Sequence, residues 1–172
     1  MIKGLIVENQ EYIEKVRVLP RAIRLEKQGN YVFVGLRRAG KTYLMYRRIR
    51  ELLDEGMSVK EILYINFEDE RLSEIKAADL NVILDCYKEL FDYRPIVFLD
   101  EIQLIEGWEK FVRRLADTDY RVYVTGSNAC MLSSEIATTL GGRFLIQEVY
   151  PYSFAEYVES QGVVLQKKYG IR

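Results

Sequence analysis

The sequence predicts an α/β protein built on a parallel β-sheet with helices on both of its faces. Along most of the chain, short apolar runs rich in β-branched and aromatic residues alternate with segments whose apolar residues recur at helical spacing. Such alternation favours β-α-β units, in which buried strands run parallel and helices cover them. No repeat, low-complexity tract or Gly/Ser linker interrupts the pattern. The 172 residues therefore suit one domain with a sizeable core.

The elements are expected in a fixed order along the chain. Residues 9–28 have apolar positions at roughly helical spacing, and Pro20 should break or restart that helix. Gly56 is a plausible C-cap of a later helix, and Ser153 with Glu156 forms a capping box. Strands are predicted over 31–35, 61–70, 94–103, 120–128 and 143–150, and further helices over 41–56, 80–91, 108–117, 129–140 and 153–160.

Composition excludes several classes of function. The chain has no histidine, so His-dependent triads, His zinc sites and imidazole acid–base catalysis are ruled out. With 25 basic and 26 acidic residues, the net charge of −1 gives no support for nucleic-acid or membrane-surface binding. Cys86 and Cys130 are interpreted as buried free thiols in a reducing compartment. No apolar run is long enough to span a membrane and no signal-peptide core is found, so a cytoplasmic location is expected.

The strongest motif is GLRRAGKT, residues 35–42, which matches the pattern GxxxxGK[ST]. It follows a predicted strand and opens a predicted helix, which is the context that a phosphate-binding loop needs. Gly35 and Gly40 allow the sharp turn that aims backbone N–H groups at phosphate oxygens. Lys41 is expected to reach the β- and γ-phosphates of a nucleotide, and Thr42 to offer a hydroxyl to Mg²⁺.

Further expectations concern the residues that flank the lysine and threonine of this motif. Ala39 and Tyr43 belong to the predicted nucleotide-binding set because they adjoin the Gly-Lys-Thr core. Arg37 and Arg38 stand where many such loops have small residues. They are either solvated loop charges or extra positive charge beside the phosphates or at a subunit contact.

A second motif is IVFLDEIQ, residues 96–103, an apolar strand that ends in two acids. Ligands of open parallel sheets bind at the carboxyl ends of the strands. Asp100 is therefore expected near Mg²⁺, through a coordinating water. Glu101 is expected to polarise the attacking water. The alternative is that the two acids only cap the next segment. The phosphate-loop motif at 35–42 makes this alternative less favoured.

Three further groups each have two interpretations. Ser127 and Asn128 end the fourth strand and either contact the γ-phosphate or the attacking water, or cap a helix. Arg143 follows two glycines and is either an arginine finger, in cis or from a neighbouring subunit, or a solvated arginine. Glu68 and Asp69 end the second strand, where a charged loop is favoured over a role at the metal.

Aromatic and basic residues are interpreted structurally. Trp108 and the tyrosines mostly lie at helix or strand spacing, which indicates packing rather than stacking on nucleic-acid bases. The two locally basic stretches, YRRIR at 46–50 and FVRRL at 111–115, are explained by solvated helix faces.

Taken together, GLRRAGKT, YINFEDERL, IVFLDEIQLIEGWEKFVRRL, VTGSNACMLSSEIATTLGGRF and PYSFAEY resemble the prokaryotic AAA-domain ATPases of the AAA_14 type. The resemblance covers about residues 15–160. It implies a three-layer P-loop fold with strand order 5-1-4-3-2 and a polar sensor at Ser127 or Asn128, and it strengthens the finger hypothesis for Arg143. Three regions are expected: an N-terminal helical segment over 1–29, the ATPase core over 30–150, and the start of a C-terminal extension over 151–172.

The predicted function is a Mg²⁺-dependent ATPase module that drives conformational change, in a homo-oligomer or in a larger protein. Members of the family are usually about twice as long and carry a C-terminal DUF4143 region, so an absent effector region is expected here. ATP is favoured over GTP because the chain lacks an Asn/Thr-Lys-x-Asp string. The alternative is a nucleotide-binding regulatory module with negligible hydrolysis. A small-molecule phosphotransferase and DNA binding have weaker support.

Overall fold

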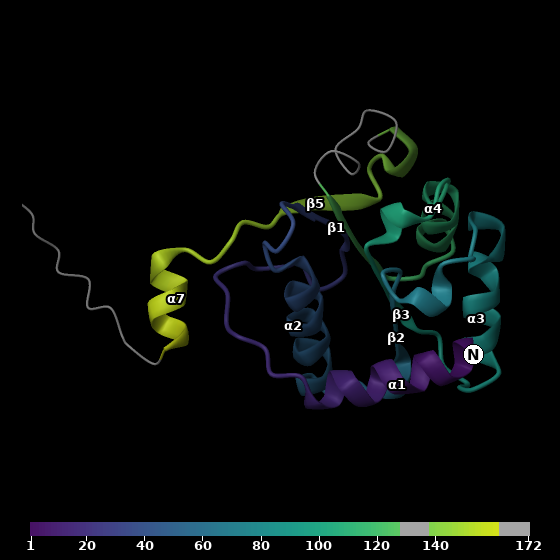
Figure 1. Ribbon diagram of the computed structural model, residues 1–172, viewed down its shortest axis with the longest axis horizontal. Coiled ribbons are helices and arrows are strands. Elements are labelled where there is room, and N and C mark those ends of the chain that lie inside the picture. Colours follow the sequence, from purple (N-terminus) through teal and green to yellow (C-terminus); the bar gives the residue numbers. More distant parts are fainter. Residues whose placement is uncertain (128–137, 162–172) are drawn as a thin grey trace, which may run out of the picture.

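The structure is a computed structural model, and it describes residues 1–127 and 138–161. A parallel five-stranded sheet in the order β2-β3-β4-β1-β5 forms its centre (Figure 1). This is the strand order 5-1-4-3-2 that the family resemblance implied, so the α/β expectation is confirmed. The strands are β1 (Asn30–Gly35), β2 (Ile62–Asn66), β3 (Ile96–Asp100), β4 (Val122–Ser127) and β5 (Phe144–Glu148).

Helices cover both faces of the sheet and one of its edges. The described helices include α1 (Ile2–Lys15), α2 (Lys41–Asp54), α3 (Leu80–Lys88), α4 (Glu109–Asp117) and α7 (Phe154–Ser160). Short 3-10 turns lie in the connections at Val59–Glu61, Glu70–Leu72, Ala77–Asp79 and Ile102–Leu104. Within the described ranges, no helix is both long and apolar enough to cross a bilayer.

The two faces of the sheet form two separate hydrophobic clusters. Because side chains alternate along a strand, neighbouring residues of β1 such as Val32 and Phe33 enter opposite clusters. One cluster joins the sheet to α3 and α4, and the other joins it to α2, which lies on the opposite side in Figure 1. In the α2 cluster, the rings of Phe98 and Tyr123 stack with centroids 4.5 Å apart. Trp108 is buried in the other cluster, as the packing interpretation predicted.

Helix α1 covers the outer edge of β2. Its Asn9 side-chain amide donates to the carbonyl of Tyr64 at 3.0 Å, and the buried amide of Gln10 donates to the carbonyl of Ile62 at 2.9 Å. An uncovered edge strand presents unpaired backbone groups, and these two bonds satisfy two of them. At the opposite edge, β5 leaves Leu145 and Ile146 exposed.

The helix expected over 9–28 is wrong in extent. Helix α1 begins at Ile2 and ends at Lys15, and no helix is found over residues 16–29. The apolar residues Val16, Val18, Ile23 and Leu25 instead pack at the margin of the α2 cluster. Their spacing of two residues on either side of Pro20 suits an extended chain, and Pro20 supplies no N–H for a helix.

Three arginines of α2 hold this extended segment in place. Arg47 donates to the carbonyls of Arg21 and Ile23 at 2.7 and 2.8 Å. The buried Arg48 donates to the Tyr123 hydroxyl at 3.0 Å and to the carbonyl of Lys27 at 3.1 Å, and Arg50 donates to carbonyls at the end of α1. The solvated-face interpretation of YRRIR is therefore wrong. These side chains satisfy a backbone that has no helical partners of its own.

The remaining elements match their predicted positions to within a few residues at each end. Gly56 has φ of 100°, which suits a glycine after the end of α2. The predicted capping box of α7 is confirmed: Glu156 N–H donates to Ser153 Oγ at 3.2 Å, and Ser153 N–H donates to Glu156 Oε2 at 3.0 Å. The helix predicted over 129–140 lies outside the described residues except for its last three, which are helical.

A close crossing of the chain explains the first glycine of the phosphate-loop motif. Val149, which follows β5, donates its N–H to the carbonyl of Val34 at 2.7 Å. A Cβ added to Gly35 would lie 2.3 Å from the carbonyl oxygen of Val149. The contact is with backbone, so it cannot be relieved by a rotamer change.

We expect Gly35→Ala to lower the free energy of unfolding by about 3 kcal/mol because β5 and the chain after it must shift. Chemical denaturation measures this loss. Gly4→Ala in α1 is the matched control, since its Cβ would make only an ordinary contact, 4.0 Å from Glu8 Oε1, and alanine in a helix gains up to about 1 kcal/mol. If Gly35→Ala and wild type are equally stable, the close approach of the Val149 backbone to Gly35 is contradicted.

Candidate nucleotide-binding site

The loop between β1 and α2 has the geometry of a phosphate-binding turn. Ala39 N–H donates to the carbonyl of Leu36 at 3.2 Å, which closes a tight turn. Gly40 has φ of 92° and precedes the first residue of α2. Arg38 has φ of 63°, a left-handed conformation that non-glycine residues adopt at a cost of about 1 kcal/mol. The turn leads directly into the N-terminus of α2. The first N–H groups of a helix have no partner within the helix, and such ends favour anions.

Lys41 lies inside the turn rather than in solvent. Its side chain is only 5% exposed, and Nζ donates to the carbonyls of Gly35 and Leu36 at 3.3 and 3.2 Å. The same Nζ lies 3.6 Å from a carboxylate oxygen of Glu101. The ammonium of Lys41 is thus buried with three contacts that are all longer than 3 Å. That Lys41 reaches the phosphates of a nucleotide stays a prediction.

Asp100 is fully buried at the end of β3, within a cluster of hydroxyl groups. Tyr64 of β2 donates its hydroxyl to Oδ2 at 2.9 Å, and Thr125 of β4 donates to Oδ1. Thr42 of α2 also bonds the carboxyl group. Tyr46 extends the cluster by donating to the Tyr64 hydroxyl at 3.1 Å. Four elements therefore meet at one carboxylate, which we call the Asp100 cluster (Tyr46, Tyr64, Asp100, Thr125 and Thr42).

Burial raises the pKa of Asp100 above its ordinary value, and the nearby charge of Glu101 adds to this, while hydrogen bonds from the three hydroxyls only partly oppose the shift. Burial also raises the pKa of Tyr46 to about 12 and that of Tyr64 further. Both phenols are therefore neutral donors at physiological pH. A neutral donor shell around a buried carboxylate stabilises its charge without adding another.

Glu101 directly follows Asp100 and has φ of 53°, a left-handed conformation that turns its side chain out of the strand direction. Its backbone N–H donates to Thr125 Oγ1 at 2.8 Å, so the same threonine anchors both acids. The Glu101 carboxylate accepts from Gln103 Nε2 at 2.5 Å and faces Lys41. Strain of this kind is characteristic of functional sites.

Two adjoining pockets lie against the loop. The first, of about 580 Å³, has both glycine-loop residues and acids in its wall: Arg37, Arg38, Gly40, Lys41, Thr42, Tyr43, Asn66, Glu68 and Glu101. The second, of about 650 Å³, is lined by Arg17, Leu19, Arg38, Ala39, Gly40, Tyr43, Pro151, Tyr152, Ser160 and Gln161. Arg38, Gly40 and Tyr43 line both, so the pockets are contiguous. We call them the phosphate-side pocket and the outer pocket.

The structure places both loop arginines beside the phosphate-side pocket. Arg37 is 92% exposed, and its guanidinium lies 3.8 Å from Glu68. This long, exposed pair contributes little stability. Glu68 thus belongs to the pocket wall, whereas Asp69 binds Arg71 and caps the following turn. The half-exposed Tyr43 lies between the two pockets.

Ser127 is the last residue of β4 and pairs in register with Gly35, at the edge where the loop begins. Asn128, the alternative sensor, lies outside the described residues. Sequence reasoning missed Thr125, Tyr64 and Asn66, which also face this edge. In β2, Asn66 pairs in register with Asp100. A polar residue near the carboxyl end of each predicted strand is the signal that could have found them.

Arg143 lies away from this site. It precedes β5, and the start of β5 pairs with Asn30, at the opposite end of β1 from Gly35. Its guanidinium binds the carboxylate of Asp117 and donates to the carbonyl of Gly141 at 3.2 Å. Strands rise about 3.3 Å per residue, so the length of β1 separates Arg143 from the loop. This position does not suit a finger acting in cis. It fits the interpretation of Arg143 as a solvated arginine in a surface ion pair, and a finger supplied from another subunit stays a prediction.

The parallel order, the turn after β1 and the acids at the end of β3 define a P-loop nucleoside-triphosphatase fold. The chain belongs to the AAA_14 family of AAA domains, whose sequence profile matches residues 27–158. It is thus a nucleotide-binding AAA module, as the motifs implied.

Two relatives and one solved structure are similar to this chain. An uncharacterised protein of Methanocaldococcus jannaschii is 36% identical over 98% of this chain and 37% of its own length. One of Haemophilus influenzae is 36% identical over 80% of this chain and 35% of its own length. This chain thus spans about a third of these relatives. Hsp104, solved in its closed state with ATPγS and FITC casein, has a similar fold, with a TM-score of 0.53 at 15% identity over 93% of this chain and 28% of its own.

We expect Asp100→Asn to stabilise the nucleotide-free protein by about 1–2 kcal/mol at pH 7.5. The raised pKa means that the folded state binds more protons than the unfolded state above the ordinary value of 3.8. Stability of the wild type therefore falls as pH rises through that window, whereas asparagine carries no charge to bury. The advantage should shrink as the pH is lowered toward 3.8.

Denaturant titrations at several pH values measure this difference, with the exposed Asp54→Asn as control. If Asp100→Asn is the less stable protein at every pH, the hydroxyl bonds outweigh the cost of burial.

Proposed function

We propose that this module binds Mg-ATP and hydrolyses it to drive conformational change in a larger protein or assembly. The observation that carries the proposal is that Lys41 at the start of α2 and Glu101 directly after β3 line one pocket and lie 3.6 Å apart, while the buried Asp100 precedes Glu101 at the end of β3. In the proposal, Lys41 is the cation that binds phosphate, and Asp100 and Glu101 are the two acids beside the turn. Phosphoryl transfer to water needs groups of these kinds.

We propose that the phosphates and the nucleoside of the nucleotide occupy different pockets. Phosphates fit the phosphate-side pocket, where Lys41 and the N–H groups of the loop supply positive charge. Arg37 and Arg38 add charge at its rim. The base and ribose fit the outer pocket, whose walls include the rings of Tyr43 and Tyr152. ATP is proposed rather than GTP because the chain has no Asn/Thr-Lys-x-Asp string.

The residues fit Mg²⁺ held jointly with the phosphates. Among the described residues, no cluster of three or more acidic or cysteine side chains could hold a metal alone. The Thr42 hydroxyl and the Asp100 carboxylate are bonded to each other, and Mg²⁺ commonly takes one or two protein oxygens together with phosphates and waters. When bound, Mg²⁺ would neutralise charge on the phosphate oxygens. Thr125 and Tyr64 would keep Asp100 oriented.

Glu101 is proposed as the group that polarises the attacking water, with Ser127 or Asn128 as the polar sensor. In the nucleotide-free structure its carboxylate contacts Lys41 and Gln103. A phosphate that attracts Lys41 would release one of these contacts and leave an oxygen free to accept a proton.

The same contacts support a second candidate, a nucleotide-binding regulatory module with negligible hydrolysis on its own. If Glu101 stays bound to Gln103 and Lys41 in the complex, no base is free. Turnover measurements separate the two functions.

We expect Glu101→Gln to bind ATP with wild-type affinity and to lower the rate of phosphate release by about 100-fold or more. Lys41→Ala should weaken ATP binding by about thirtyfold or more because the negative charge of the phosphates loses the Lys41 ammonium as its partner. Calorimetry with ATP or GTP and Mg²⁺, and steady-state phosphate release, measure these effects.

The exposed Glu106→Gln and Lys110→Ala are matched controls. Equal turnover in Glu101→Gln and wild type would overturn the assignment of Glu101. Unchanged ATP affinity in Lys41→Ala would overturn the phosphate loop itself. Tight binding without phosphate release in the wild type would favour the regulatory module.

Arg143 is proposed to act in trans, on the nucleotide of a neighbouring copy. Arg143 is exposed at the end of the sheet opposite the loop, and its surface ion pair with Asp117 would have to open for it to reach another subunit. An arginine supplied in this way stabilises charge on the transferred phosphoryl group. This role requires a homo-oligomer. An effector region outside these residues would be the element that such an assembly moves.

We expect Arg143→Ala to lower turnover by about 1000-fold without changing ATP affinity. Mixing it with Lys41→Ala should restore part of the activity, since each protein supplies what the other lacks. Arg113→Ala is the matched control because Arg113 also pairs with Asp117. If the mixture releases no more phosphate than its two components measured separately, the role in trans is wrong.

A further inference from the structure

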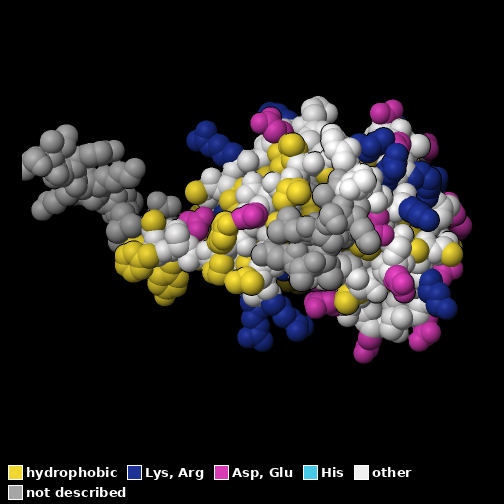
Figure 2. All heavy atoms as spheres, turned by 90° about the horizontal axis from the view of Figure 1, so that it is seen from above, with side chains coloured by type: hydrophobic (Ala, Val, Ile, Leu, Met, Phe, Trp, Pro, Cys, Tyr) yellow, Lys and Arg dark blue, Asp and Glu magenta, His cyan; other side chains and the backbone are white. Residues whose placement is uncertain are grey.

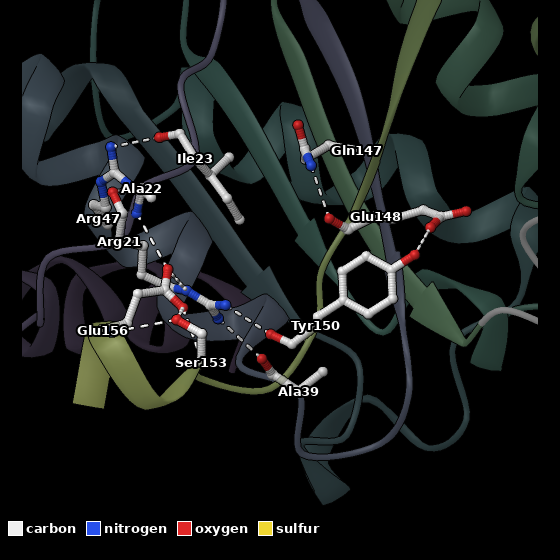
Figure 3. A network of polar contacts seen from close by, with 10 residues as sticks. All are labelled: Arg21, Ala22, Ile23, Ala39, Arg47, Gln147, Glu148, Tyr150, Ser153 and Glu156. Atoms are coloured by element: carbon white, nitrogen blue, oxygen red, sulfur yellow. Dashed lines mark hydrogen bonds and ion pairs between the residues drawn. The ribbon is translucent and has the colours of Figure 1, made fainter. Parts of the chain in front are cut away.

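Arg21 links parts of the chain that lie far apart in sequence (Figure 3). It belongs to the extended segment after α1, and its side chain is only 5% exposed. Nη1 donates to the carbonyl of Ala39 in the phosphate loop at 3.1 Å. Nη2 donates to the carbonyl of Tyr150 after β5 at 2.6 Å, and Nε pairs with Glu156 of α7 at 3.4 Å.

The partner of Arg21 on α7 is itself firmly held. Glu156 Oε1 accepts from the N–H of Ala22 at 3.2 Å, and Oε2 accepts from the Ser153 N–H at 3.0 Å. Although burial raises the pKa of Glu156, these backbone bonds and the charge of Arg21 outweigh it and hold the pKa below its ordinary value. Glu156 is therefore ionised at neutral pH, and it fixes both the guanidinium and the backbone of the segment that carries it.

Arg21 also contacts the glycine turn of the phosphate loop and a residue that lines the outer pocket. A Cβ added to Gly40 would lie 3.2 Å from Nη1, so the guanidinium packs against the turn itself. Its plane lies over the ring of Tyr152 at 4.5 Å, and Tyr152 lines the outer pocket together with Ala39 and Gly40. The two last described residues of the chain, Ser160 and Gln161, line the same pocket.

We propose that Arg21 is a positioning residue that couples the phosphate loop to α7. A planar guanidinium offers five donors in fixed directions, and here it uses them on three different segments. A shift of the Ala39 carbonyl on nucleotide binding would change the position of Arg21 and, through Glu156, that of α7. Coupling is reciprocal, so a loosened α7 should also loosen the phosphate loop.

An effect of this coupling on nucleotide binding rests on the proposed function. The coupling between the phosphate loop and α7 can be tested without nucleotide. Hydrogen exchange is measured on peptides that cover 36–43 and 150–161, in wild type, Arg21→Gln, Arg21→Lys and Glu156→Gln. We expect Arg21→Gln and Glu156→Gln each to speed exchange about tenfold in both peptides, since each loses a charge-assisted bond. Arg21→Lys should behave similarly because a single ammonium cannot reach three acceptors.

The control is Arg24→Gln, an exposed arginine of the same segment, which should match the wild type in both peptides. Combining Arg21→Gln with Glu156→Gln should add little to Arg21→Gln alone, as expected for two groups that act as one unit. If Glu156→Gln speeds exchange only in 150–161 and leaves 36–43 unchanged, the coupling is overturned.

Calorimetric titration with Mg-ATP tests whether the coupling between α7 and the phosphate loop affects ATP affinity. Glu156→Gln should weaken ATP binding about three- to tenfold at a temperature where the protein is still folded, although Glu156 lines neither pocket. Wild-type ATP affinity in Glu156→Gln would overturn a role in positioning the loop. If the wild type itself binds no ATP, the proposed function fails, and the exchange experiment still decides the link between the loop and α7.

Discussion

A single buried carboxylate constrains the centre of this molecule. Asp100 lies at the end of β3 with no exposed surface, and its charge must be satisfied by hydrogen bonds. The donors come from β2, β4 and the first turn of α2, through Tyr64, Thr125 and Thr42. Only a sheet in which β3 lies between β2 and β4, with α2 starting above that edge, can supply all three. Burying this charge lowers the stability of the fold, as is common where a protein holds a polar site ready for a ligand.

Arginine has a structural role that its charge alone does not suggest. Arg47, Arg48 and Arg50 bind backbone carbonyls of the extended segment or of the end of α1. Arg21 of that segment then binds the phosphate loop and α7. The segment therefore has a fixed path without any helix. On the face seen in Figure 2, basic and acidic side chains are interspersed, while hydrophobic side chains gather toward α7.

Much of the fold and the centre of the site could be predicted from local pattern. A β-rich run followed by GxxxxGK[ST] predicts β1, the loop and α2, and an apolar strand ending in Asp100 and Glu101 predicts the acids. The rest could not be predicted in this way. Tyr64 and Thr125 are ordinary strand residues in sequence, and their bonds to Asp100 span 36 and 25 residues. The segment over 16–29 was predicted as helix because its apolar residues, two apart around Pro20, also fit a loose helical spacing.

The sequence by itself determined the alternation of strands and helices, the family, and the identity of Lys41, Thr42, Asp100 and Glu101 as candidates. It could do so because periodicity and capping are local, and because a phosphate loop is contiguous in the chain. Only the tertiary structure decided which side chains share a site. It brought Arg21 to Ala39, placed Thr125 under both acids and put Arg143 at the far end of β1. These are relations between segments, and they follow from strand order and register, which no local pattern contains.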